Sequence, residues 1–186
     1  MLMPQGENMK AFIILADGFE EIEAFTVVDV LRRARVDIIT VGLTSSVVEG
    51  SHGIRAVADK KMADINPDSF DMLVLPGGNP GYTNLANSGK VLGIVKDFNK
   101  KKKIIAAICA APYVLAKAGI MENRVATIYP GMEKELPRPR DAKVVVDGNI
   151  VTSRSPGTAM EFALKLAEIA TNKATAKKVR EHMVID

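Results

Sequence analysis

Short apolar runs that end abruptly at glycine, proline or cysteine recur along this chain. Met9–Asp17 ends at Asp-Gly, Phe70–Gly78 ends at Pro-Gly-Gly, and Lys103–Ile108 ends at Cys109. Short runs with apolar residues at consecutive positions are typical of strands buried on both faces. Such strands need helices above and below them, so this feature restricts the chain to a layered α/β fold.

Segments with apolar residues at helical spacing separate these runs. Between residues 20 and 35 the apolar positions recur every three or four residues, as expected for a helix. Alternation of strands and helices predicts a doubly wound sandwich with a mostly parallel sheet. Further helices are predicted at residues 88–99, from 110 to about 118, from Thr158, where Thr158–Glu161 forms a capping-box pattern, and at 175–183. Further strands are predicted at residues 36–43, near Val125, and at 142–148 and 149–153 around Gly148.

The stretch Ser45–Asp59 contains two short extended segments around a Gly-Ser-His-Gly turn, which predicts a small β-hairpin excursion from the sheet. No linker or internal repeat interrupts the pattern. We therefore expect a single domain over residues 9–186, preceded by a disordered leader at residues 1–8.

Composition excludes several classes of protein. A single cysteine cannot form an internal disulfide, and no stretch approaches the roughly 20 consecutive apolar residues that cross a bilayer. The net charge is only +3, and the one dense basic run, Lys100–Lys103, directly precedes an apolar strand, as a solvated helix end would. The sequence therefore predicts a soluble, cytoplasmic protein that binds neither nucleic acid nor a membrane.

Ligands of doubly wound folds bind beyond the carboxyl ends of strands. This rule directs attention to residues 18–23, 76–81, 109–112 and 153–158, with Asn79, Arg154 and Pro156 as candidate lining residues. Cys109 stands at a strand-to-helix turn, where unpaired N–H groups favour the nucleophilic thiolate. The alternative of a buried structural cysteine stays open.

Two other features accompany this cysteine. Gly77 and Gly78 could direct backbone N–H groups at an anion, although a purely structural Gly-Gly turn is the more common explanation. Glu23 lies on a first helix whose apolar flanks leave little polar surface, so we expect burial against both the sheet and a second subunit. Such a carboxyl group tends to hold its proton. His52 and His182 are not predicted beside strand ends, and no metal-ligand spacing appears.

Four segments together resemble one family. They are ADGFEEIEAFTVVDVLRRA, LVLPGGNPG, IIAAICAAPYVLAKAGI and VTSRSPGTAMEFAL, and they resemble the ThiJ/PfpI superfamily, most closely its branch containing the Parkinson-associated protein deglycase. The resemblance runs from about Met9 to the C-terminus. It implies a flavodoxin-like three-layer α/β/α sandwich, a homodimer through the first helix and no cofactor.

The resemblance also implies roles for single residues. Cys109 matches the family's nucleophile, Glu23 the carboxyl group that hydrogen-bonds its sulfur, and Gly78 and Ala110 the amides of the anion site. Tyr129 stands where some relatives have a histidine, which argues against a peptidase with a Cys-His pair. The implied activity is glyoxalase-like or deglycase-like, on small aldehydes or glycated proteins. A non-enzymatic chaperone that senses oxidants through Cys109 remains the alternative.

Overall fold

The computed structural model describes residues 9–185, so the predicted leader at residues 1–8 lies outside the described residues. Strands and helices alternate along the chain as the apolar runs predict. The strands are β1 (Lys10–Leu15), β2 (Asp37–Gly42), β3 (Val47–Glu49), β4 (Arg55–Val57), β5 (Lys60–Lys61), β6 (Met72–Leu75), β7 (Ile104–Ile108), β8 (Val144–Asp147) and β9 (Ile150–Ser153). The α-helices are α1 (Glu21–Arg33), α2 (Gly81–Asn87), α3 (Gly89–Lys100), α4 (Pro112–Lys117), α5 (Ala159–Ala170) and α6 (Lys173–His182), with 3₁₀ turns at Pro67–Ser69, Glu133–Glu135 and Pro156–Thr158.

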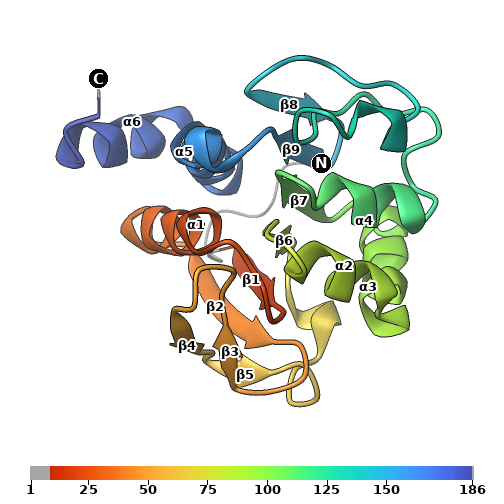
Figure 1. Cartoon of the computed structure of the whole chain (residues 1–186). Coiled ribbons are helices and arrows are strands. Elements are labelled where there is room, and N and C mark those ends of the chain that lie inside the picture. The colour runs from red at the N-terminus through yellow and green to blue at the C-terminus, as the bar shows by residue number, and fades with distance from the viewer. Residues whose placement is uncertain (1–8, 186) are drawn as a thin grey trace.

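Seven strands form one sheet in the order β5-β2-β1-β6-β7-β9-β8. Neighbours pair in parallel except β8, which runs antiparallel to β9. Helices α1, α5 and α6 lie on one side of this sheet, and α2, α3 and α4 lie on the other (Figure 1). The predicted flavodoxin-like three-layer α/β/α sandwich is therefore confirmed.

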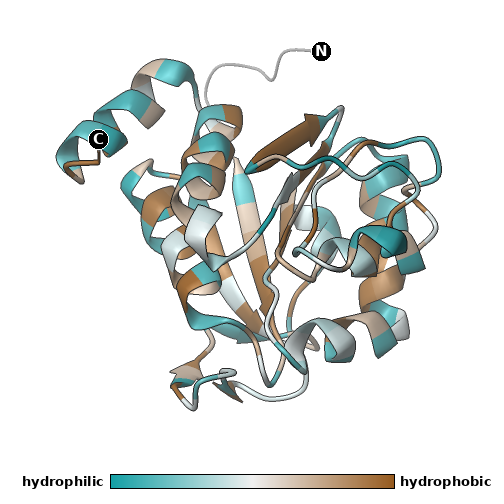
Figure 2. Ribbon diagram, turned by 45° about the horizontal axis from the view of Figure 1, so that its top comes forward, coloured by the Kyte–Doolittle hydropathy of each residue, from teal (hydrophilic) through white to brown (hydrophobic). Residues whose placement is uncertain are grey.

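Each central strand contributes to two cores. In β1, Ile13 and Leu15 pack toward α1 and α5, whereas Phe12 and Ile14 pack toward α3 and α4, as alternating side chains of a strand must. Apolar residues consequently run along the strands between the two helix layers (Figure 2). This double burial explains why the strands read as unbroken apolar runs rather than as alternating patterns.

The excursion after β2 is the predicted hairpin: β3 and β4 pair antiparallel, apart from the main sheet. Two elements, β5 and α2, were not predicted. Both are short, and the two residues of β5 are lysines, so neither carries a readable apolar period.

Two predictions were wrong. The predicted strand near Val125 is only an isolated bridge between Ala126 and Pro139. The predicted capping box also fails, because the Thr158 side chain makes no cap hydrogen bond to α5. Its hydroxyl oxygen accepts instead from the Ser155 N–H at 3.1 Å, while Glu161 pairs with Lys143.

Among residues 9–185, no helix is long and apolar enough to cross a membrane.

Truncation of a core residue of β6 tests the two-sided burial. Leu73 is fully buried, so Leu73→Ala should lower the free energy of unfolding by about 2–5 kcal/mol through lost burial and a residual cavity. Val184→Ala, at a side chain that is 86% exposed, should change it by less than about 0.5 kcal/mol. Urea unfolding measures both. Equal effects of the two substitutions would contradict the assignment of Leu73 to the core.

Candidate functional site

Cys109 occupies a sharp turn at the end of β7. Its φ is 63°, a left-handed conformation that costs a non-glycine residue about 1–2 kcal/mol. Two hydrogen bonds hold this backbone: the Cys109 N–H donates to the Ser153 carbonyl, and the Tyr129 N–H donates to the Cys109 carbonyl, both at 2.8 Å. The side chain is 8% exposed. The fold therefore fixes the direction of the thiol at the cost of local strain.

Glu23 reaches this turn from the first turn of α1. The residue has no exposed surface, and its Oε2 accepts a hydrogen bond from the Gly77 N–H at 2.7 Å. Its Oε1 is buried and has no N–H or O–H partner among residues 9–185. The carboxyl group lies next to Cys109, because a Cβ on Gly77 would lie 2.9 Å from Glu23 Oε2 and 2.7 Å from the Cys109 Cβ. The structure thus brings together the two residues that the sequence singled out from segments 86 positions apart.

Burial dominates the electrostatics of this pair. It raises the pKa of Glu23 from 4.5 to about 7, against the opposing hydrogen bonds from Gly77 and the thiol. Burial and the Glu23 charge raise the pKa of the Cys109 thiol far above its ordinary value, although the N–H groups of Ala110 and Gly78 oppose the rise. Two buried groups in contact cannot both ionise at neutral pH. The pair therefore retains at least one proton there.

This balance differs from the predicted thiolate at a helix N-terminus. Helix α4 has six residues, too short for a strong macrodipole, and the cysteine precedes it by three positions. The groups that favour the thiolate are the N–H groups of Gly78 and Ala110. Only protonation of Glu23 lets the sulfur ionise, so thiol reactivity depends on Glu23.

The two glycines have separate places in the site. Gly78 has a φ of 92°, and a Cβ there would lie 2.3 Å from the Gly18 carbonyl oxygen, so only glycine fits. Its N–H faces the sulfur, as does that of Ala110. The Gly77 N–H is instead committed to Glu23, so it is not directed at an anion beside the sulfur.

The structure places the remaining candidates in different surroundings. Tyr129 is joined to Cys109 through the backbone and is 46% exposed. Asn79 is exposed just after Gly78, and Pro156 is half-buried at the start of a 3₁₀ turn. Arg154 pairs with Asp141 at 2.5 Å and lines a separate cavity of about 350 Å³ beside Thr127 and Arg140.

His52 lies against the start of α1, a contact that the sequence did not predict. Its Nδ1 lies 2.8 Å from Glu21 Oε2, next to the first turn of α1. One carboxylate oxygen from each of Glu20 and Glu21 and a ring nitrogen of His52 lie within 4.8 Å of one another, so the structure forms a charged cluster that linear spacing could not show. The one sequence signal for this contact was the predicted hairpin, because the turn of a hairpin that leaves the sheet has to pack near the end of a strand.

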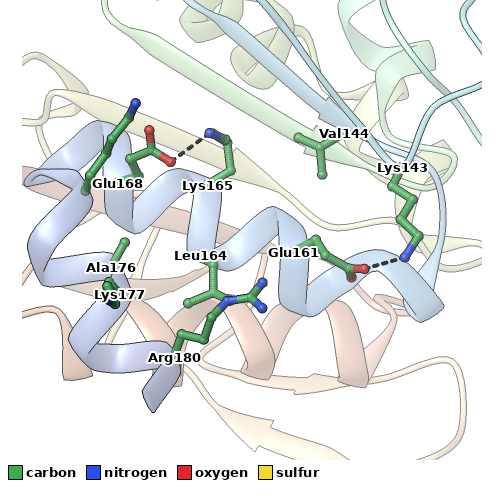
Figure 3. A pocket seen from close by; sticks show the side chains of 10 residues that line it. Lys143, Val144, Glu161, Leu164, Lys165, Glu168, Ala176, Lys177 and Arg180 are labelled. Carbon is green, nitrogen blue, oxygen red and sulfur yellow. Dashed lines mark hydrogen bonds and ion pairs between the residues drawn. The ribbon is translucent and has the colours of Figure 1, made fainter. Parts of the chain in front are cut away.

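Another cavity, of about 430 Å³, opens between α5, α6 and the start of β8 (Figure 3). It is lined by the ion pairs Lys143–Glu161 and Lys165–Glu168 around the apolar Leu164. Neither Cys109 nor Glu23 lines it. Because both glutamates of this cavity are already paired with lysines, the chemistry of the molecule points to the cysteine turn instead.

Comparison with known proteins identifies relatives along most of the chain. A model of the DJ-1/PfpI family matches residues 9–169. The chain is 39% identical to Protein dj-1beta of Drosophila melanogaster over 96% of this chain and 98% of the relative. It is 35% identical to the Parkinson disease protein 7 homolog of Danio rerio, over 95% and 97%. Among solved structures, Drosophila melanogaster DJ-1beta matches with a TM-score of 0.93 at 38% identity, over 97% of this chain and 100% of that chain. Oxidized Toxoplasma gondii DJ-1 matches with a TM-score of 0.91 at 34% identity, over 95% and 98%.

Substitution of Gly78 tests the close approach of the loops. Gly78→Ala should lower the free energy of unfolding by about 2 kcal/mol or more, because the new Cβ meets backbone and φ is positive. Gly93→Ala is the matched control: it is an exposed helical position where a Cβ would have no other atom within 4 Å, so alanine should stabilise by about 0.5–1 kcal/mol. Urea denaturation of both variants measures the contrast. Equal changes in the two variants would contradict it.

The raised pKa of Glu23 has a measurable effect on stability. Between about pH 4.5 and 7 the unfolded chain ionises Glu23 while the folded chain keeps it protonated, so stability falls as pH rises. Glu23→Gln removes this dependence. The free energy of unfolding of the variant relative to the wild type should therefore increase across this window, by up to about 3 kcal/mol for a shift of this size. Denaturation at several pH values measures it, and a constant difference would contradict the buried, protonated acid.

Proposed function

Because the chain belongs to the DJ-1/PfpI family, we propose that it is a cysteine-dependent stress-response enzyme that acts on reactive dicarbonyls or glycated adducts. The single observation that supports this proposal is the buried pair of Cys109 and Glu23, which lies beside the N–H groups of Gly78 and Ala110. A pair of this kind can supply a nucleophile and a proton donor at the same moment.

Addition to methylglyoxal is the first step of the proposed reaction. The Cys109 sulfur forms a bond to the aldehyde carbon, and the carbonyl π electrons move to oxygen. The N–H groups of Gly78 and Ala110 stabilise the developing oxyanion, which then takes the proton of Glu23. The product is a hemithioacetal, and Glu23 is left as a carboxylate.

Proton transfer between neighbouring carbons follows. The Glu23 carboxylate removes the proton from the former aldehyde carbon, giving an enediolate. It then returns this proton to the adjacent carbon while the hydroxyl proton passes from one oxygen to the other, giving a lactoyl thioester. Water hydrolyses this thioester and releases lactate and the thiol. The balance is one methylglyoxal and one water in, one lactate and one proton out. No cofactor takes part, and Glu23 supplies the acid and base work that an imidazole in place of Tyr129 would otherwise share.

A homodimer through α1 belongs to the same proposal. Ile22 is 58% exposed and Phe25 is 38% exposed on this helix, whereas Val27, Val30 and Leu31 are buried within the chain. Exposed large apolar side chains on one face are typical of subunit contacts. We infer that a second copy covers this face, and that the protein acts in the cytoplasm on small aldehydes or glycated proteins.

The second candidate is a redox-sensing chaperone. Peroxide oxidises a thiolate to sulfenate and then, with a second equivalent, to sulfinate, each step releasing one water. The related Toxoplasma gondii structure is described as oxidized, which favours this chemistry as an alternative. Intact mass after mild peroxide separates the two candidates: a gain of two oxygen atoms with altered holdase activity and no dicarbonyl turnover supports the sensor.

Turnover of methylglyoxal tests the leading proposal. Purified protein should produce lactate without added glutathione, and Cys109→Ser should abolish the activity because serine remains protonated at neutral pH. Glu23→Gln should lower kcat by about 100-fold or more, the usual contribution of a general acid or base. Lactate is measured by an enzyme-coupled assay and the fold by circular dichroism. Absence of lactate from folded wild type, or equal rates in wild type and Cys109→Ser, would overturn the proposal.

A further inference from the structure

The turn between β3 and β4 forms hydrogen bonds with Glu21, the first residue of α1. Glu21 Oε1 accepts from the His52 N–H at 2.8 Å, and Glu21 Oε2 lies 2.8 Å from His52 Nδ1 and 3.2 Å from Ser51 Oγ. The Ser51 N–H also donates to the Phe19 carbonyl at 2.8 Å. His52 is thereby held against the loop that leads into α1, although its side chain is 70% exposed.

Glu20 connects these contacts to the pair of Glu23 and Cys109. Glu20 Oε1 lies 3.9 Å from His52 Nδ1, and its Oε2 accepts from the Glu23 N–H at 2.7 Å. The Glu20 N–H donates to the Gly77 carbonyl at 3.0 Å, and the Gly77 N–H in turn donates to Glu23. A continuous series of polar contacts therefore runs from the exposed imidazole to the buried carboxyl group.

The charges along this series are unevenly compensated. Glu20 is 6% exposed and Glu21 is 5% exposed, and His52 forms an ion pair with both when its imidazole is protonated. Within the hairpin, Glu49 and Arg55 pair with each other at 3.1 Å and leave the imidazole to the two acids. Buried carboxylates require a countercharge, so loss of the imidazolium charge leaves net negative charge close to Glu23.

We propose that His52 is a positioning residue whose charge controls how readily the Glu23 and Cys109 pair releases its shared proton. A protonated imidazole compensates Glu20 and Glu21 and eases that release, whereas a neutral imidazole leaves their charge to hold the proton in place. The hydrogen bond with Glu21 and the attraction of its charge raise the pKa of His52 and so favour the protonated imidazole. This inference rests on the proposed pairing of Glu23 with Cys109 and concerns its regulation.

Two substitutions that both remove the imidazole but differ in charge test the proposal. His52→Gln removes the positive charge, and His52→Lys makes it permanent. The thiolate of Cys109 is followed in the full-length protein by its ultraviolet absorbance during a pH titration, with Cys109→Ser as the blank. The midpoint should lie higher in His52→Gln than in His52→Lys by about 0.3 to 1 pH unit, the shift expected of one charge acting through a partly solvated region.

Two controls separate charge from structure. His182→Gln removes the other histidine, on α6, and should leave the midpoint at the wild-type value. Raising the ionic strength should shrink the difference between His52→Gln and His52→Lys, because an exposed charge is screened by salt. The rate of Cys109 alkylation by iodoacetamide at neutral pH, read by intact mass, provides a second measurement, and the lysine variant should react faster.

Equal midpoints in the two His52 variants would overturn the inference. If both midpoints also differ from the wild-type value, the role of His52 is purely structural. Neither measurement requires turnover of a substrate. Failure of the glyoxalase proposal therefore leaves this test intact, and a lactate-producing enzyme with equal midpoints would refute the inference alone.

Discussion

The hydrogen bond from the Gly77 N–H to the buried Glu23 carboxyl group is the interaction on which the site depends. It joins the first turn of α1 to the end of β6 and holds the Glu23 carboxyl group in its buried position beside Cys109. A Cβ at position 77 would lie 2.7 Å from the Cys109 Cβ and 2.9 Å from Glu23 Oε2. The three groups converge only because no side chain stands between them. The cost of burying an acid is met here by keeping it protonated.

The order of the strands explains why this meeting takes place where it does. From β1 the chain crosses to β2 on one side and later returns to β6 on the other, so the direction of winding reverses between β1 and β6. Such reversal points open a crevice at the carboxyl ends of the strands. The loop after β1 and the start of α1 supply Glu20 to Glu23, the loop after β6 supplies Gly77 and Gly78, and β7 delivers Cys109 beside them.

Sequence reasoning identified those features that depend on local pattern. The central strands are buried on both faces, so they read as continuous apolar runs, and the glycines and the cysteine that follow them stood out as candidates. It did not identify features that depend on contacts between distant segments. The lysines of β5 carry no period, the Thr158 hydroxyl is diverted to Ser155, and His52 meets Glu21 only after the hairpin folds back.

The ionisation of Cys109 likewise depends on contacts that the sequence does not show. A helix start beside a cysteine favours the thiolate, and the sequence contains that signal. The sequence does not contain the depth of burial, which raises the pKa of the sulfur and of Glu23 together. Only one of the two can be charged, so the reactive species is a thiolate with a protonated acid beside it, a minor member of a proton-sharing pair. Anything that alters the charge near Glu23 changes the population of that species, and the series of contacts from His52 through Glu20 provides one route by which an exposed group can do so.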